Sequence, residues 1–130
     1  MKGKILVVED SATQRKILCR LLRDDGYEVL EAEDGQAGAR LARAERPDLI
    51  LTDIEMPVLD GIDMCSMIKA DPVTASIPVV ILSMRDADAD VRRGLEVGAA
   101  DFIPKDACAH ASVLAEVEMM LSFARQGRTR

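Results

Sequence analysis

The sequence predicts an α/β fold in which a doubly wound parallel sheet of five strands carries helices on both faces. Short apolar runs such as residues 5–8 and 49–52 are typical of parallel strands that are buried on both faces. Segments with apolar residues at helical spacing separate these runs, so strands and helices alternate along the chain. With 130 residues, the chain is long enough for one domain whose core needs neither disulfides nor a structural metal.

The first half of the chain predicts three strands and two helices. The strands are expected at residues 5–8, 27–31 and 48–53. The first helix follows Ser11, a favourable cap, and stops at the Asp-Asp-Gly sequence of residues 24–26. The second helix opens at Asp34 and Gly35 and is closed by Pro47.

The second half predicts two strands and three helices, with loops at residues 56–61 and 72–78. The expected elements are a helix at 62–69, a strand at 77–82, a helix at 86–97, a strand at 100–103 and a helix at 107–124. We therefore expect one domain over residues 1–124, followed by a tail or the start of a linker at residues 125–130.

Composition favours a soluble, folded, cytoplasmic protein. The net charge of −6 argues against general binding to nucleic acid or to a membrane surface, and no apolar run reaches the length of a membrane span. Residues 1–3 lead directly into the first strand, which leaves no room for a secretory signal. The thiols of Cys19, Cys65 and Cys108 are widely spaced, so we expect reduced cysteines rather than a disulfide framework or a metal-binding pair.

Three carboxylates are expected at one edge of the sheet. Glu9 and Asp10 follow the first strand, and Asp53 ends the third. A crossover connection brings parallel strands in on the same side, so these side chains meet. Like charges about 4 Å apart repel by roughly 1 kcal/mol in water and about 4 kcal/mol at an effective dielectric near 20. The cluster therefore requires a cation, and oxygen ligands favour Mg²⁺ or a close relative such as Mn²⁺.

Polar residues also follow the later strands, at the edge where such sheets bind ligands. Ser83 follows the fourth strand, and Lys105 lies just beyond the fifth. The sequence also contains three motifs: Val-Val-Glu-Asp at 7–10, Asp53-x-x-Met-Pro-x-x-Asp-Gly at 53–61 and Gly-Ala-Ala-Asp-Phe-Ile-Pro-Lys at 98–105. With Ser83, Lys105 and these motifs, the chain resembles the receiver domain of bacterial two-component response regulators, such as the chemotaxis regulators. The resemblance implies a flavodoxin-like sheet with strand order 2-1-3-4-5.

The resemblance also implies the chemistry of the site. Asp53 would accept a phosphoryl group from a phosphohistidine and form an aspartyl phosphate. Asp10, Asp53 and the backbone carbonyl of Glu55 would hold Mg²⁺, with Glu9 acting mainly through water. Lys105 and the Ser83 hydroxyl would contact the phosphoryl oxygens. The chain would then be a switch rather than an enzyme, limited to self-phosphorylation and self-dephosphorylation of Asp53.

The same resemblance implies how the signal spreads. When Ser83 is drawn toward the phosphoryl group, it vacates space that the ring of Phe102 fills by turning inward. This movement repacks the surface made by the fourth helix, fifth strand and fifth helix. The implied partners are a sensor histidine kinase or phosphotransfer protein and an output domain or effector protein, with no direct contact to nucleic acid or membrane.

Each candidate residue also has an ordinary structural explanation. A single aspartate at a strand end is usually a cap or a solvated turn residue. For Ser83 the ordinary explanation is a cap of the fourth helix, although Asp86 is better placed for that role. The remaining explanations are a surface lysine for Lys105, a core ring for Phe102, a solvated rim charge for Glu9 and a structural or surface role for His110.

The chain departs from the common receiver pattern near the site. Asp106 follows Lys105 where most receivers have proline, and we expect the Lys105–Asp106 bond to be trans. The long side chain of Met84 is expected to narrow access to the phosphoacceptor, and a pair between Arg85 and Glu55 is expected to modulate the pocket.

Two features concern the switch surface. The last helix carries no basic residue before Arg125, so the dimer that one receiver subgroup forms through its fourth and fifth helices is not supported. Gly94 lies inside the predicted fourth helix and weakens it by about 1 kcal/mol relative to alanine. It either softens that helix or is a tolerated surface glycine.

Two other classes of protein remain as alternatives. A Mg²⁺-dependent phosphatase that forms an aspartyl phosphate normally carries Asp-x-Asp, whereas residues 53–55 read Asp-Ile-Glu. A flavin- or nucleotide-binding module needs a glycine-rich phosphate loop after the first strand, and residues 9–12 read Glu-Asp-Ser-Ala.

Overall fold

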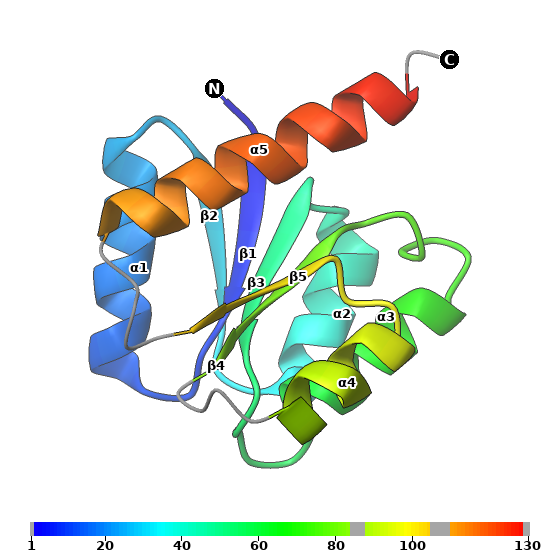
Figure 1. Ribbon diagram of the computed structural model, residues 1–130. Helices are drawn as coiled ribbons and strands as arrows, with labels where there is room; N and C mark the ends of the chain where they lie inside the picture. Colours follow the sequence, from blue (N-terminus) through cyan, green and yellow to red (C-terminus); the bar gives the residue numbers. More distant parts are fainter. Residues whose placement is uncertain (1, 84–87, 105–109, 129–130) are drawn as a thin grey trace.

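The computed structural model describes residues 2–83, 88–104 and 110–128 and shows one five-stranded sheet with five helices (Figure 1). The strands are β1 (Lys4–Val8), β2 (Glu28–Ala32), β3 (Leu49–Asp53), β4 (Val79–Ser83) and β5 (Asp101–Pro104). The helices are α1 (Ala12–Asp24), α2 (Gly35–Glu45), α3 (Gly61–Ala70), α4 (Asp88–Glu96) and α5 (His110–Arg128). Strand and helix alternate throughout, which confirms the predicted α/β class.

All paired strands of the sheet are parallel, and their order is β2-β1-β3-β4-β5. This order confirms the flavodoxin-like arrangement that the resemblance implies. The register brings the carboxyl ends of the strands together, because Val8 pairs with Thr52 and Asp53 pairs with Leu82. Ser83 pairs in turn with Pro104 at the end of β5.

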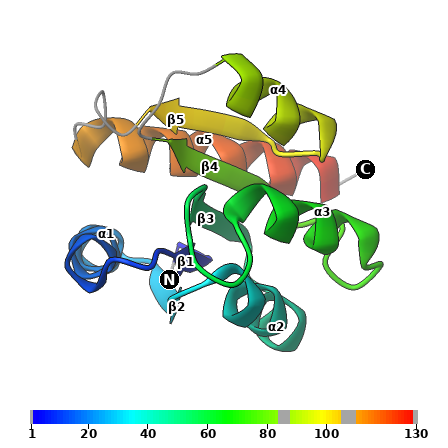
Figure 2. The same ribbon diagram turned by 90° about the horizontal axis from the view of Figure 1, so that it is seen from below.

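The helices cover both faces of the sheet (Figure 2). On one face, α1 and α5 bury a cluster that includes Ile5 and Val7 of β1. On the other face, α2, α3 and α4 cover a second cluster that includes Leu6 and Val8 of the same strand. Successive side chains of a strand point to opposite faces, so a strand that is buried on both sides must be apolar at every position.

Within the described ranges, polar side chains cap α1, α2 and α3 where the sequence turns from strand or loop to helix. Ser11 accepts a hydrogen bond from Gln14 N, Asp34 accepts one from Ala37 N, and Asp60 accepts one from Asp63 N. Each cap satisfies a backbone donor that has no partner within the first helical turn. The predicted cap at Ser11 is confirmed, and the second helix starts after Asp34, where the sequence predicts that it opens.

Several element boundaries differ from the predicted ones. β2 begins at Glu28, one residue after the predicted start, because Tyr27 donates its backbone N–H to Leu22 O at the end of α1. α5 runs to Arg128, four residues beyond the predicted end at 124, so the helix extends into the predicted tail. No helix in the described part of the chain is long and apolar enough to cross a membrane.

The interpretation of Gly94 as a surface glycine is wrong. This residue of α4 is buried, and a Cβ atom placed on it would overlap the ring of Phe102. The same added Cβ would lie 3.3 Å from Cδ1 of Ile81 in β4. Gly94 is therefore a point of close approach between α4 and the sheet.

Candidate functional site

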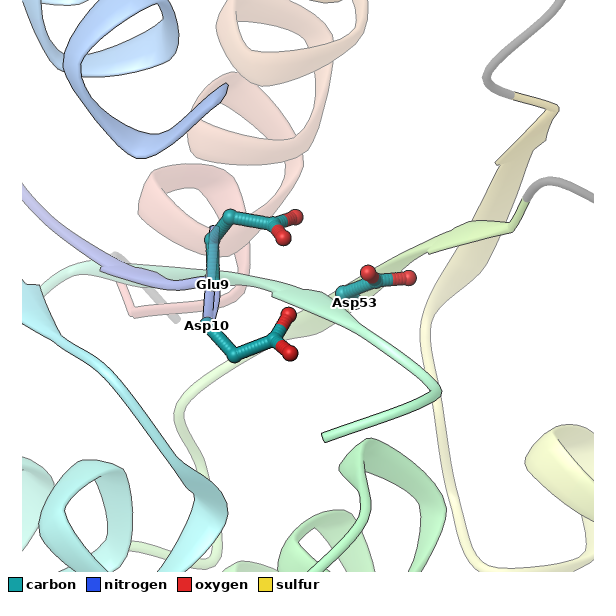
Figure 3. Close-up of side chains that lie close together, drawn as sticks. All are labelled: Glu9, Asp10 and Asp53. Carbon is teal, nitrogen blue, oxygen red and sulfur yellow. The ribbon is translucent and has the colours of Figure 1, made fainter. Parts of the chain in front are cut away.

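The three predicted acidic residues meet at the carboxyl edge of the sheet. Glu9 and Asp10 follow β1, Asp53 ends β3, and one carboxylate oxygen from each lies within 4.8 Å of the other two. In Figure 3, the side chains of Glu9 and Asp10 extend from the end of β1 toward Asp53 at the end of β3. The residues differ in exposure, since Glu9 is 1% exposed, Asp53 is half-buried and Asp10 is exposed. The cluster is thus open to solvent on the Asp10 side.

Main-chain contacts fix the buried member of the cluster. The backbone N–H of Ser11 donates to Glu9 Oε1 at 3.2 Å, which helps to satisfy a carboxylate that is almost fully removed from water. Arg15 of α1 donates from Nη1 to the backbone carbonyl of Glu9 at 2.8 Å and pairs through Nε with Glu31 at 3.2 Å. Arg15 therefore ties the loop after β1 to α1 and β2.

Asp53 is held by its own strand and by the loop that follows. Its Oδ1 accepts a hydrogen bond from the backbone N–H of Ile54 at 2.8 Å, which orients the carboxylate. Its backbone carbonyl accepts a hydrogen bond of 2.9 Å from the fully buried hydroxyl of Thr52. A Cβ placed on Gly61 would overlap that same carbonyl oxygen. The Asp-Gly sequence at the start of α3 is therefore required by the close approach of α3 to the end of β3.

The loop between β3 and α3 is anchored at its other end to α2. The backbone N–H of Gly35 donates to Leu59 O at 3.1 Å, and a Cβ on Gly35 would overlap that oxygen. Leu59 N in turn donates to Pro57 O at 2.7 Å, which closes a three-residue turn around Val58. Val58 has φ 71° and its side chain is 74% exposed, so a β-branched residue occupies the left-handed region.

The remaining predicted site residues lie at the same edge or outside the described residues. The backbone of Ser83 ends β4, one residue beyond the partner of Asp53. Glu55 lies in the loop two residues after Asp53 and is exposed. The predicted ligand Lys105, the pocket residues Met84 and Arg85, the cap Asp86 and the Lys105–Asp106 bond all fall outside the described residues.

Phe102 lies on β5 opposite Ile81 of β4 and packs against the core cluster that α2, α3 and α4 cover. Its side chain is half-buried, and its backbone N–H donates to Asp101 Oδ1 at 2.8 Å. The ring therefore occupies the α4 side of the sheet. His110 is the first residue of α5.

The donor set fits a hard divalent cation. Three carboxylates within one small site concentrate negative charge, and carboxylate oxygens are the ligands that Mg²⁺ prefers. The partly open position on the Asp10 side suits Mg²⁺ as well, because this ion usually keeps several waters.

Several residues that position the site were not found by sequence reasoning. The side chains of Thr52 and Arg15 donate to backbone carbonyls of the site loops, and no sequence motif indicates these contacts. A signal existed for Gly61 and Gly35, since each follows an aspartate at the start of a helix, and such an Asp-Gly pair marks a cap followed by a position of close approach.

The sequence matches a family model described as the response regulator receiver domain over residues 5–118. Among curated proteins, the chain is 40% identical over 103 residues to protein PilH of Pseudomonas aeruginosa, covering 79% of this chain and 85% of PilH. It is 41% identical over 105 residues to the response regulator PleD of Caulobacter vibrioides, covering 81% of this chain. The match spans only 23% of PleD, so this chain corresponds to about a quarter of that relative.

Solved structures give the same result. The signal receiver domain of a signal transduction histidine kinase from Syntrophus aciditrophicus superposes with a TM-score of 0.85 at 39% identity, covering 92% of this chain and 90% of that one. A second solved structure is the receiver domain of the sensor histidine kinase PA1611 from Pseudomonas aeruginosa, which has a magnesium ion coordinated in its active site cleft. It has a TM-score of 0.85 at 28% identity, and the match covers 92% of this chain and 98% of that one. The chain therefore belongs to the response regulator receiver domains, the phosphorylation-dependent signalling switches of two-component systems.

Proposed function

We propose that Asp53 is the phosphoacceptor of this receiver domain and that its donor is the phosphohistidine of a sensor histidine kinase or phosphotransfer protein. One observation carries the proposal. Asp53 ends β3 within 4.8 Å, oxygen to oxygen, of both acidic residues that follow β1. Such a cluster is electrostatically unfavourable unless a cation joins it, and a cation is what phosphoryl transfer to a carboxylate requires.

The transfer is a single displacement at phosphorus. A carboxylate oxygen of Asp53 forms the new P–O bond while the P–N bond to the donor imidazole breaks, and the imidazole leaves with the electron pair. The hydrogen bond from Ile54 N to Oδ1 keeps the carboxylate oriented during this step. Hydrolysis of the aspartyl phosphate by water returns the chain to its starting state.

The residues proposed to hold Mg²⁺ are Asp10, Asp53 and the backbone carbonyl of Glu55, with Glu9 acting through water. The ion, when bound, neutralises charge on the phosphoryl oxygens as they pass through the transition state. The buried position of Glu9 supports an indirect role, because its Oε1 already accepts a hydrogen bond from Ser11 N. Among the described residues, nothing favours Mn²⁺ over Mg²⁺.

Lys105 and Ser83 are proposed to contact the phosphoryl oxygens. The strand register supports this role, since Asp53 pairs with Leu82, Ser83 pairs with Pro104, and Lys105 is the next residue in the sequence after Pro104. Met84 and Arg85 follow Ser83 in sequence and are proposed to shape access to the pocket together with Glu55.

The proposed output is a change in the surface formed by α4, β5 and α5, which an output domain or an effector protein would read. The relative PleD is a longer response regulator, which supports an output beyond the receiver domain. A cytoplasmic location is part of the same proposal and is supported by Cys19 and Cys65, which are both buried free thiols.

Acetyl phosphate provides a test that needs no knowledge of the kinase. Incubation of the chain with acetyl phosphate and Mg²⁺ should add one labile phosphoryl group, detected by intact-mass spectrometry and removed by hydroxylamine. Asp53→Asn should take up none. Asp25→Asn is the matched control, because Asp25 lies beyond the other end of the sheet, where its side chain pairs with Lys2.

Two results would contradict the proposal. Incorporation into Asp53→Asn equal to that of the unaltered chain would place the phosphoryl group elsewhere. Continuous turnover of added phosphomonoesters, without a phosphorylated chain that accumulates, would favour the phosphatase alternative.

A further inference from the structure

The ring of Phe102 occupies space that a side chain on α4 would otherwise fill. A Cβ atom placed on Gly94 would overlap the Cζ and Cε2 atoms of the ring and would lie 3.3 Å from Ile81 Cδ1. We call this space, bounded by the Gly94 backbone and by Ile81, the Gly94 seat. Because the ring lies against bare backbone, even one methyl group at position 94 is incompatible with the ring in its present place.

The backbone conformation of Gly94 does not explain why glycine is present. Among the described glycines, positive φ values occur at Gly3, Gly26 and Gly98, whereas Gly94 lies within the regular helix α4. A glycine inside a helix is less favourable than alanine, because it has more freedom to lose on folding. The contact with Phe102 is the feature of this position that alanine cannot reproduce.

Backbone hydrogen bonds attach the end of α4 to the sheet. Ala99 N donates to Gly94 O at 2.9 Å, and Ala100 N donates to Val79 O at 2.8 Å, which ties the segment after α4 to β4. The ring of Phe102, in contrast, belongs to a half-buried side chain that can change its position by rotation about its side-chain torsion angles. An added methyl group at Gly94 is therefore expected to displace the ring rather than the helix.

We infer that Gly94 is a positioning residue for the switch: it keeps open the seat beneath α4 that the ring of Phe102 occupies, and so couples the position of that ring to α4. This inference rests on the proposed function, in which the ring position follows the phosphorylation of Asp53. The Gly94 seat gives the movement of the Phe102 ring a defined end point, with the Gly94 backbone on one side and the Ile81 side chain of β4 on the other.

The ring position can be measured directly because the chain contains only two phenylalanines. In protein labelled with ring-¹³C phenylalanine, the unaltered chain should show cross-relaxation between the Phe102 ring and the α protons of Gly94. Gly94→Ala should move the Phe102 ring signals toward solvent-exposed values. Phe123 of α5, which is 63% exposed, serves as the internal reference and should not shift.

A variant cycle separates the seat from a general effect on the helix. Gly94→Ala should lower the melting temperature of the unaltered chain but raise it in a Phe102→Ala background, where the overlap is gone and alanine only improves the helix. Leu95→Ala, at an exposed position of the same helix, is the control and should not move the Phe102 signals. If Gly94→Ala fails to fold alone, Phe102→Ala must restore folding.

The coupling to the phosphorylation site has its own measurement. Beryllofluoride with Mg²⁺ mimics a phosphoryl group on aspartate, and its apparent affinity for Gly94→Ala should fall by at least about fivefold, the low end of coupling between linked sites. In the Phe102→Ala background the substitution should have no further effect on this affinity.

Phe102 signals that do not move in Gly94→Ala would overturn the inference, as would a change of melting temperature with the same sign in both backgrounds. Unchanged beryllofluoride affinity in Gly94→Ala would also overturn it. These outcomes leave the phosphorylation of Asp53 intact. Failure of the unaltered chain to take up a phosphoryl group would contradict the proposed function instead, while the ring measurement in the absence of phosphodonor would still report on the seat.

Discussion

At the scale of single residues, the loop after Asp53 combines close backbone contacts with one strained position. Gly61 and Gly35 allow α3 and α2 to approach the loop at each end. Between them, Val58 adopts φ 71° in a tight turn although its side chain is β-branched. Residues in this region cost about 1–3 kcal/mol unless they are glycine. The anchors on either side explain how this strain is maintained.

Replacement of Val58 by glycine should therefore stabilise the protein. Relief of the strained φ outweighs the added freedom of glycine in the unfolded chain, so Val58→Gly should raise the free energy of unfolding by about 1 kcal/mol in urea denaturation. Val73→Gly is the matched control, since Val73 is also an exposed loop valine but has no positive φ. The control should lower the free energy of unfolding, and a loss of stability in Val58→Gly as well would show that the turn carries no strain.

The acidic members of the site were predictable residue by residue, and the residues that position them were not. Glu9, Asp10 and Asp53 stand at the ends of apolar runs, where the rules of parallel sheets place them together. Arg15 and Thr52 act on backbone carbonyls from a helix and from within a strand, and their identity does not show which way their side chains point. Gly94 was misread for the same reason, because the sequence does not show that the side chain of Phe102, eight residues later, points toward α4.

At the scale of elements, β5 and α5 bring two carboxylates together outside the metal site. Oε1 of Glu116 is buried and accepts no hydrogen bond from the described residues, because the neighbouring Asp101 carboxylate is itself an acceptor. A proton shared between the two carboxylates satisfies both. Together with burial and the charge of Asp101, this hydrogen bond raises the pKa of Glu116 to about 7.

The shared proton predicts a pH dependence of stability. Since the pKa of Glu116 is raised in the folded state from an ordinary value of 4.5 to about 7, its stabilising contribution is fully present below pH 4.5 and is lost as the pH rises to about 7. Between pH 4.5 and about 7, the melting temperature of the unaltered chain should therefore fall relative to that of Glu116→Gln, whose side chain is a neutral hydrogen-bond donor at every pH.

Glu118→Gln, an exposed position on the same helix, is the control for the loss of a charge. Its melting temperature should follow that of the unaltered chain between pH 4.5 and 7. A constant difference between Glu116→Gln and the unaltered chain across this range would show that Asp101 and Glu116 do not share a proton.

Element types and order were predictable, whereas element ends were less so. Apolar runs and helical periodicity identified all ten elements, and cap residues placed the starts of α1 and α2. The boundaries of β2 and α5 depend on competition between neighbouring elements for backbone hydrogen bonds, as at Tyr27, and a local pattern does not resolve that competition.

At the scale of the whole molecule, the register of the sheet turns separate sequence signals into one site. Val8 pairs with Thr52, Asp53 with Leu82 and Ser83 with Pro104, so the carboxyl ends of β1, β3, β4 and β5 lie along one edge of the sheet. The alternation of strand and helix predicts such a sheet, but it does not by itself give the order β2-β1-β3-β4-β5. That order followed from the resemblance to receiver domains and is confirmed by the structure.

The central claim is that the acidic cluster holds the Mg²⁺ that allows Asp53 to be phosphorylated. It is tested most directly by the rate of Asp53 phosphorylation by acetyl phosphate as Mg²⁺ is titrated. We predict a saturable rise from no reaction in EDTA, and a requirement for at least about tenfold more Mg²⁺ in Asp10→Asn than in the unaltered chain or in Asp25→Asn. Phosphorylation of Asp53 that proceeds equally in EDTA, or an Asp10→Asn titration identical to that of the unaltered chain, would contradict the claim.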